Sequence, residues 1–211
     1  EGDIRIAVIQ TPKISNFTDF DALAHEKDVA LYYVKSVEDL GEPDVIMLPG
    51  SKNTTEDMLY LRKSGLGEKI LAHAKAGKAV IGICGGYQML GEVIRDPQHT
   101  ESQNDEVAGL GLLGMETVFA SEKLTSQVVA QCQDLHFLGQ SISVDNLQGY
   151  EIHMGHTTFT READKHPFTV CQRRGKTCAS QEGTANAAGN VFGTYIHGVF
   201  DNDVFRRSVL N

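Results

Sequence analysis

The sequence predicts an α/β fold, in which a mostly parallel sheet is flanked by helices and is followed by a more β-rich second half. Three observations support this class. Short apolar runs rich in β-branched residues alternate with helical stretches in the first half, one of these runs leads straight into a cysteine and a helix start, and the second half changes to shorter strand-like segments. Strands that alternate with helices imply a parallel sheet covered on both faces.

Four buried strands and two helices are expected in the first half. One helix is capped by Asn53 or Thr54 and carries an apolar stripe on one side. A second helix covers residues 67–76 and ends at Gly77, a usual residue after the last helical turn. The expected strands cover residues 4–9, 29–34, 44–48 and 79–83.

The second half opens with a polar stretch over residues 95–107, which predicts a mobile surface loop. A final helix begins near Asn202 or Asp203. The strand-like segments between them cover residues 115–119, 127–132, 149–155, 168–172 and 191–196.

The length of 211 residues fits one substantial core, so a single domain over residues 1–211 is expected. The chain opens at Glu1 rather than at a methionine, and it closes at Asn211 inside the last expected helix. These ends predict a carboxy-terminal piece of a longer polypeptide.

Composition argues against several classes of function. The formal net charge of -9 is unlike that of nucleic-acid binders, which gather basic residues on one face. No apolar run is long enough for a transmembrane helix, and no signal segment opens the chain, so a cytoplasmic protein is expected. The four cysteines lack C-x-x-C spacing, so neither a metal site nor a disulfide framework is indicated.

Cys84 is the candidate nucleophile. It follows a buried strand and precedes a helix start within Gly82-x-Cys84-x-Gly86, a spacing that permits a tight turn and projects the side chain above the edge of the sheet. A helix amino terminus beside the sulfur stabilises the thiolate. The alternative is a small buried core cysteine, the usual fate of a lone thiol. The nearby glycines favour the nucleophile.

A second sharp corner, after the expected strand at 44–48, supplies candidate oxyanion donors. The backbone amide of Gly50 would stand at the same sheet edge as Cys84, and with the amide of Gly85 it would form an oxyanion hole. A phosphate loop is excluded because G-x-x-x-x-G-K-[ST] is absent from the chain. A simple helix cap remains compatible with the oxyanion role.

Among eight histidines, His197 is the candidate base, because it ends an expected buried strand at a glycine turn. By sequence pattern alone His153 is nearly equal to it. In strand alternation, Glu151 shares a face with His153. A structural imidazole is the alternative for both histidines.

Five motifs resemble, in order and across nearly the whole chain, the glutaminase domain of cobyric acid synthase, a class I-like amidotransferase family of cobalamin biosynthesis. A lone G-x-C-x-G would not be specific, whereas five ordered motifs are. They are SNFTDFD at 15–21, LPGSKNT at 48–54, GICGGYQ at 82–88, GYEIH at 149–153 and YIHGVF at 195–200.

The resemblance implies a class I glutaminase-like (flavodoxin-like) fold, in which Cys84 attacks the side-chain amide of glutamine and His197 moves protons. It also implies that Gln88 helps to hold the substrate, although Gln88 could equally be an ordinary residue in the first turn of a helix. The ammonia would pass to an amino-terminal synthetase domain of the same polypeptide, which would use ATP and magnesium to amidate carboxylates of a corrinoid, adenosylcobyrinic acid diamide. No cofactor is expected in the glutaminase domain itself.

One position departs from better-known class I glutaminases, which carry an acid two residues after the histidine. Val199 stands there, and Glu151 is the expected substitute, either as an orienting carboxylate or as an anchor for substrate or a partner domain. Two other functions stay open: a glutaminase subunit for cell-wall lipid amidation, and a non-catalytic glutamine-binding module. The motifs at 15–21 and 48–54 favour the cobamide family over the first, and intact Cys84 and His197 argue against the second.

Overall fold

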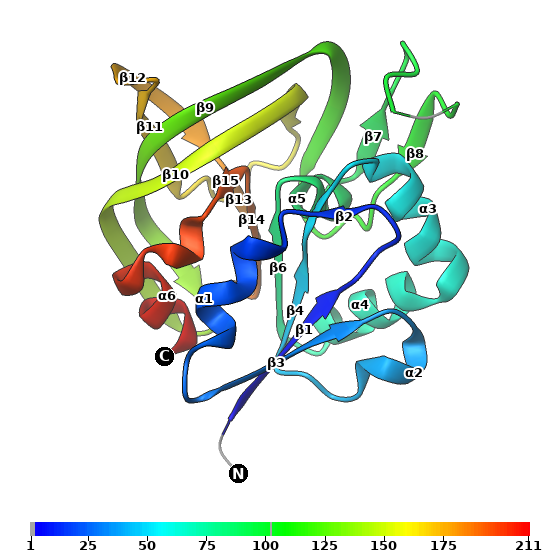
Figure 1. Ribbon diagram of the computed structural model, residues 1–211, viewed down its shortest axis with the longest axis horizontal. Coiled ribbons are helices and arrows are strands. Elements are labelled where there is room, and N and C mark those ends of the chain that lie inside the picture. The colour runs from blue at the N-terminus through cyan, green and yellow to red at the C-terminus, as the bar shows by residue number, and fades with distance from the viewer. Residues whose placement is uncertain (1–2, 102) are drawn as a thin grey trace.

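A six-stranded sheet forms the centre of the molecule. The computed structural model describes residues 3–101 and 103–211, without the side chains of residues 122, 124, 153 and 154. All neighbouring strands of the central sheet run parallel except the last pair. In spatial order the strands are β3 (Val29–Val34), β1 (Ile4–Ile9), β4 (Val45–Leu48), β6 (Ala79–Ile83), β14 (Val191–Thr194) and β13 (Thr184–Ala185) (Figure 1).

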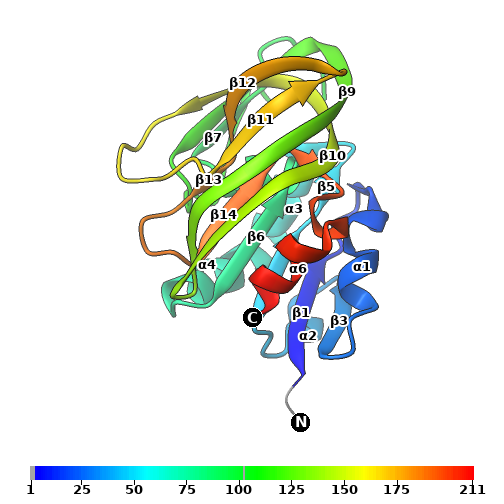
Figure 2. The ribbon, with the colours of Figure 1, turned by 90° about the vertical axis from the view of Figure 1, so that its left-hand side faces the viewer.

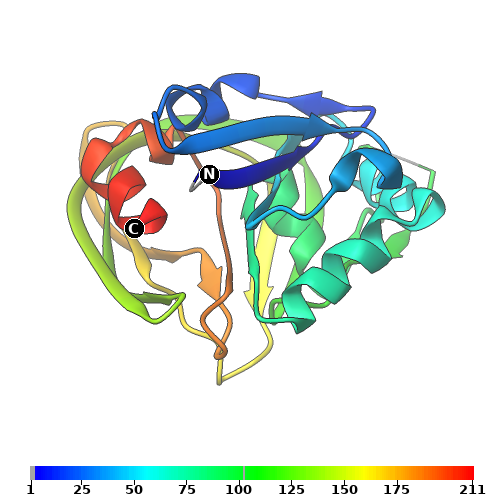
Figure 3. The same cartoon turned by 90° about the horizontal axis from the view of Figure 1, so that it is seen from below.

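Helices cover one face of this sheet. Alternate strand residues pack against α3 (Thr54–Ser64) and α4 (Leu66–Lys75), and the two helices lie on the same side of the sheet when it is viewed from below (Figure 3). The side chain of Asn53 accepts a hydrogen bond from the Glu56 amide at 3.1 Å, so Asn53 rather than Thr54 caps α3. The shorter helices α2 (Val37–Leu40) and α5 (Gly85–Leu90) contribute to the same core.

The opposite face is covered mainly by a second sheet. Two long strands, β9 (Met115–Phe137) and β10 (Gln140–Phe159), form an antiparallel hairpin that arches over the central sheet (Figure 2). The helices α1 (Asp21–Ala24) and α6 (Asp203–Leu210) fill the remaining space on this face. The other strands of this layer are β7 (Val93–Arg95), β8 (Glu106–Ala108), β11 (Phe168–Arg173), β12 (Lys176–Glu182) and β15 (Ile196–His197).

The α/β class with a β-rich second half is confirmed, and some details differ from expectation, since the segment expected at 191–196 is divided between β14 and β15 and the one expected at 149–155 lies within the longer β10. The segments expected at 115–119 and 127–132 belong to one strand, in which residues 124–126 between them also pair with β10. The loop expected at 95–107 begins and ends in paired strands, and part of it is anchored. The amides of Thr100 and Glu101 donate to the buried carboxylate of Asp96, and the Asn53 side chain donates to the Glu101 carbonyl at 2.6 Å.

The strand ends bring separate parts of the chain to one edge. Cys84 follows β6, and the short strand β5 (Gly50–Ser51) follows β4 and pairs with β2 (Ile14–Ser15). β15 leaves the central sheet and pairs with β10. The edge thus collects residues from near both ends of the chain. Within the described residues, no helix is long and apolar enough to cross a membrane.

Candidate active site

Cys84 lies in a strained turn between β6 and α5. Its backbone has φ 53° and ψ -108°, a conformation that residues other than glycine seldom adopt. Two glycines make the turn possible. A Cβ atom at Gly86 would lie 2.0 Å from the carbonyl oxygen of Leu48, and one at Gly82 would lie 2.7 Å from the backbone of Gly86. The half-buried Cys84 side chain lines a pocket of about 310 Å³.

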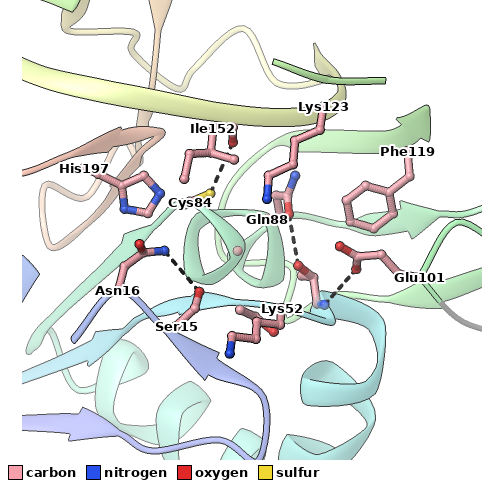
Figure 4. A pocket seen from close by; sticks show the side chains of 13 residues that line it. Ser15, Asn16, Lys52, Cys84, Gln88, Glu101, Phe119, Lys123, Ile152 and His197 are labelled. Atoms are coloured by element: carbon pink, nitrogen blue, oxygen red, sulfur yellow. Dashed lines mark hydrogen bonds between the residues drawn. The ribbon is translucent and has the colours of Figure 1, made fainter. Parts of the chain in front are cut away.

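His197 lies beside Cys84 and is held by Asp19 (Figure 4 shows the histidine and the cysteine). Its Nδ1 atom is 2.8 Å from Oδ2 of Asp19, whose other oxygen accepts a hydrogen bond from the Gly198 amide at 2.7 Å. The Tyr150 ring stacks on the imidazole, with the ring centroids 5.0 Å apart. Since Nδ1 is engaged, Nε2 is the nitrogen left for the sulfur, and it is buried without a hydrogen-bond partner among the described residues.

These neighbours determine the charge of His197. Burial lowers its pKa, but the hydrogen bond to Asp19 and the interactions with the Cys84 sulfur outweigh burial and raise the pKa of His197 to about 10. A protonated imidazole beside the sulfur stabilises a thiolate. The arrangement therefore suits nucleophilic catalysis, in which the histidine carries the proton that is transferred.

Asp19 was not expected at this site. It lies in the 3-10 turn η1 (Phe17–Phe20), 178 positions before His197, so no local pattern connects the two. Its place within the motif at 15–21 was the one signal that pointed to it. Val199, at the position of the usual acid, is buried in the core between the sheets.

The structure places Glu151 on the other side of β10. Tyr150 lies opposite His197 in the β10–β15 pair, and neighbouring strand residues point to opposite faces. Glu151 accordingly points away from Cys84, and Arg173 donates to its carboxylate at 3.2 and 3.3 Å. This position corrects the expectation that Glu151 orients the histidine or anchors substrate beside Cys84.

The other expected residues come together at the pocket. Gly85 and Gln88 line it directly, and the Gln88 amide oxygen accepts a hydrogen bond from the Thr54 hydroxyl at 3.3 Å. Gly50 lies immediately behind, since a Cβ atom there would be 3.4 Å from Cε1 of His197. The side chain of His153, the rival base, lies outside the described residues.

Further pocket residues were given no role from sequence, although all except Glu101, Phe119 and Lys123 lie within the quoted motifs. They are Ser15, Asn16, Ser51, Lys52, Thr54, Glu101, Phe119, Lys123 and Ile152. Over the part of the chain that the structure describes, no group of three or more His, Cys, Asp and Glu side chains is arranged to hold a metal ion.

Comparison with known proteins identifies the class. A family model described as the CobB/CobQ-like glutamine amidotransferase domain matches residues 5–205, and the chain belongs to this family. Its curated relatives include a cobyric acid synthase of Clostridium tetani, 50% identical over 208 residues, and one of Moorella thermoacetica, 47% identical over 211 residues. These alignments cover 99% and 100% of this chain, which spans only 40% of the length of each relative.

Solved structures support the fold at much lower sequence identity. PurLQS from Thermotoga maritima superposes with a TM-score of 0.71 at 19% identity, covering 99% of this chain and 98% of the other. A glutamine amidotransferase from the same organism superposes with a TM-score of 0.60 at 15% identity, covering 99% and 87%. The class I glutamine amidotransferase-like fold predicted from sequence is thereby confirmed.

The Asp19–His197 contact gives the first testable prediction. Replacing Asp19 by Asn should lower kcat of glutaminase activity by at least ~10-fold, with an upper bound near the ~10⁴-fold known for a Ser-His-Asp triad. Because the carboxylate helps to raise the pKa of His197, its loss should also move the alkaline limb of the kcat/KM profile to lower pH.

Rate–pH profiles of the two proteins measure both effects. The matched control is Asp21→Asn, an exposed carboxylate in the same segment, which should leave the profile unchanged. A lower rate with an unmoved alkaline limb would mean that Asp19 acts only through folding.

Proposed function

We propose that this chain hydrolyses glutamine to glutamate and ammonia through a thioester on Cys84. The observation that carries the proposal is the Cys84–His197–Asp19 arrangement, with a strained nucleophile and a buried, oriented imidazole. The membership of the glutamine amidotransferase family supports glutamine as the substrate. Intact catalytic groups disfavour a purely non-catalytic glutamine-binding module.

In the proposed reaction, the Cys84 thiolate adds to the side-chain carbonyl carbon of glutamine. The resulting oxyanion would accept hydrogen bonds from the backbone amides of Gly50 and Gly85. Their proximity supports this pairing, because a Cβ atom on Gly85 would lie 3.0 Å from the nitrogen of Ser51, the residue after Gly50. Gln88 would help to hold the substrate from the wall of the same pocket.

Proton transfer would then proceed through His197. When the tetrahedral adduct collapses, the imidazolium gives its proton to the departing nitrogen, and the C–N bond breaks to leave ammonia and a glutamyl thioester. The neutral imidazole next takes a proton from water, which attacks the thioester. The C–S bond breaks, the sulfur recovers as thiolate, and glutamate leaves with the histidine protonated again.

The relatives support a proposal for the destination of the ammonia. We propose that residues 1–211 form a single cytoplasmic glutaminase domain without a cofactor of its own. An amino-terminal synthetase domain of the same polypeptide would use this ammonia, with ATP and magnesium, to amidate corrinoid carboxylates on the way from adenosylcobyrinic acid diamide to cobyric acid. High identity to cobyric acid synthases over the whole chain supports this assignment over cell-wall lipid amidation.

The thioester can be tested by trapping. The electrophilic glutamine analogue 6-diazo-5-oxo-L-norleucine should modify one residue per chain, Cys84, as read by peptide mass spectrometry. Glutamine should protect against the modification, and untreated protein should release glutamate and ammonia in equal amounts. Absence of both modification and hydrolysis, in this chain and in the longer protein, would contradict the proposal.

The ammonia transfer gives a separate prediction for the longer protein. A Cys84→Ala variant should lose glutamine-dependent amidation of the corrinoid but keep amidation from added ammonium salt, because the synthetase chemistry needs only free ammonia. Product formation from each nitrogen source, followed by chromatography, measures the two activities. Loss of the ammonia-dependent reaction in a folded variant would show that Cys84 does more than release ammonia.

A further inference from the structure

The pocket beside Cys84 contains charged groups that the proposed chemistry leaves unused. Glu101 comes from the loop between β7 and β8, and Lys123 comes from β9, so the two reach the pocket from different layers of the fold. Figure 4 shows both side chains on the same side of the pocket as Gln88, with Cys84 and His197 beyond it. Charges of opposite sign thus lie at the end of the pocket away from His197.

Glu101 is held in place by several hydrogen bonds. Its carboxylate accepts from the Thr54 amide at 2.8 Å, and its main chain is fixed by Asn53 on one side and Asp96 on the other. Thr54 also donates to Gln88. A continuous line of polar contacts therefore runs from Glu101 through Thr54 to Gln88, and it fixes the position of the carboxylate in the pocket.

The surroundings of Glu101 lack a positive partner. No basic side chain forms an ion pair with it within residues 3–101 and 103–211. Burial, together with the negative charges of Asp96 and Asp57, raises the pKa of Glu101 to about 7 despite the lowering effect of the hydrogen bonds from the amides of Thr54 and Thr55. An ammonium group entering the pocket would supply the missing positive charge.

We propose that Glu101 binds the α-ammonium group of the substrate and that Lys123 binds its α-carboxylate. The inference rests on the proposed glutaminase function and extends it to the other end of the substrate. With the side-chain amide at Cys84, the two charged groups on the α-carbon need partners of opposite sign at the far end of the pocket. Phe119 lines the same pocket and offers apolar contact to the methylene groups. Together, Glu101 and Lys123 would favour glutamine, which carries both charged groups on its α-carbon, over primary amides that lack one of them.

Two truncated substrates separate this role from a purely structural one. 4-Carbamoylbutanoate lacks the α-amino group of glutamine, and 4-aminobutanamide lacks the α-carboxylate. Wild-type protein should prefer glutamine over either, measured as the ratio of kcat/KM values for ammonia release. In Glu101→Gln, kcat/KM for glutamine should fall ~10-fold or more while that for 4-carbamoylbutanoate stays constant, because only glutamine loses a charge-assisted contact.

Lys123→Met should show the complementary pattern, losing the preference for glutamine over 4-aminobutanamide. The matched controls are Glu106→Gln, an exposed carboxylate at the start of β8, and Lys69→Met, on the exposed face of α4, and both should retain the wild-type ratios. Glu101→Asp, which keeps the charge, should restore part of the preference. If Glu101→Gln does not unfold cooperatively on heating, the Glu101→Asp variant is used in its place for the comparison of substrates.

Each outcome decides the proposal. If Glu101 only caps α3, Glu101→Gln will lower kcat/KM for glutamine and 4-carbamoylbutanoate by the same factor, and the assignment of Glu101 is overturned. If Lys52→Met rather than Lys123→Met removes the preference over 4-aminobutanamide, the assignment of Lys123 is overturned. This inference alone would be refuted if the glutamine analogue modifies Cys84 in the wild-type protein and ammonia is released without any preference among the three amides. Failure of both modification and hydrolysis would refute the glutaminase function itself.

Discussion

Replacing Cys84 by alanine is expected to abolish glutamine hydrolysis. The sulfur forms the covalent bond to substrate in the proposed reaction, so its loss removes the whole thioester route rather than weakening one contact. Activity should fall to the detection limit in a coupled assay for glutamate. The substitution should create no large packing defect, because the half-buried side chain lines the pocket. Thermal unfolding should therefore remain cooperative.

The other three cysteines provide matched controls. Cys132 is buried in the core, and burial raises the pKa of its thiol to about 12, so it remains protonated at neutral pH. Cys171 and Cys178 lie on β11 and β12 and donate to main-chain carbonyls of the same sheet. Alanine at any of these positions should preserve most of the activity. Hydrolysis that survives in Cys84→Ala, or disappears in one of the controls despite normal folding, would contradict the assigned nucleophile.

Replacing His197 by alanine should cause the second largest loss of activity. We expect kcat to fall by about 10²–10⁴-fold, which is the usual contribution of a general acid–base group. The imidazole both donates the proton to ammonia and activates water in the proposed reaction. Its burial against Tyr150 means that truncation also leaves a gap, so unfolding of each variant must be measured beside the rate.

The rival histidine supplies the comparison. His153→Ala should lower kcat less than His197→Ala, because the Asp19 carboxylate orients His197 and the Nε2 atom of that ring is left for the sulfur. If His153→Ala is the more damaging change in proteins of equal stability, the assignment of the base is reversed.

Four strands of the central sheet could be predicted, because their short runs of apolar, β-branched residues are visible in the sequence. β1, β3 and β6 agree with the predicted ranges, and β4 is one residue shorter. The hairpin of β9 and β10 has a weaker sequence pattern. Its middle residues include the exposed Ser121, Lys123 and Thr125, which show no apolar alternation, and Thr125 is placed by its pairing with Ile152 of β10.

Some residues of the candidate site could likewise be predicted from sequence and others could not. Cys84 was predictable because a nucleophile elbow demands small residues at fixed local spacing. Asp19 was not, since its role depends on which turn comes to lie under β15, and a motif match alone does not reveal that contact. Glu151 shows the limit of alternation: strand periodicity relates neighbouring side chains, but the pairing of Tyr150 with His197 decided which face met the pocket.

The contact between Asp19 and His197 also bears on when the protein acquires activity. It closes a loop of 178 positions, so it forms only after most of the chain has found its place. A ribosome-bound chain that has not yet released residue 197 therefore has no oriented base, and the Cys84 turn also depends on this late segment, because the Cys84 amide donates to the Thr194 carbonyl at 2.8 Å. If the proposed function is right, recovery of glutaminase turnover after denaturation should therefore occur later than the recovery of helical structure.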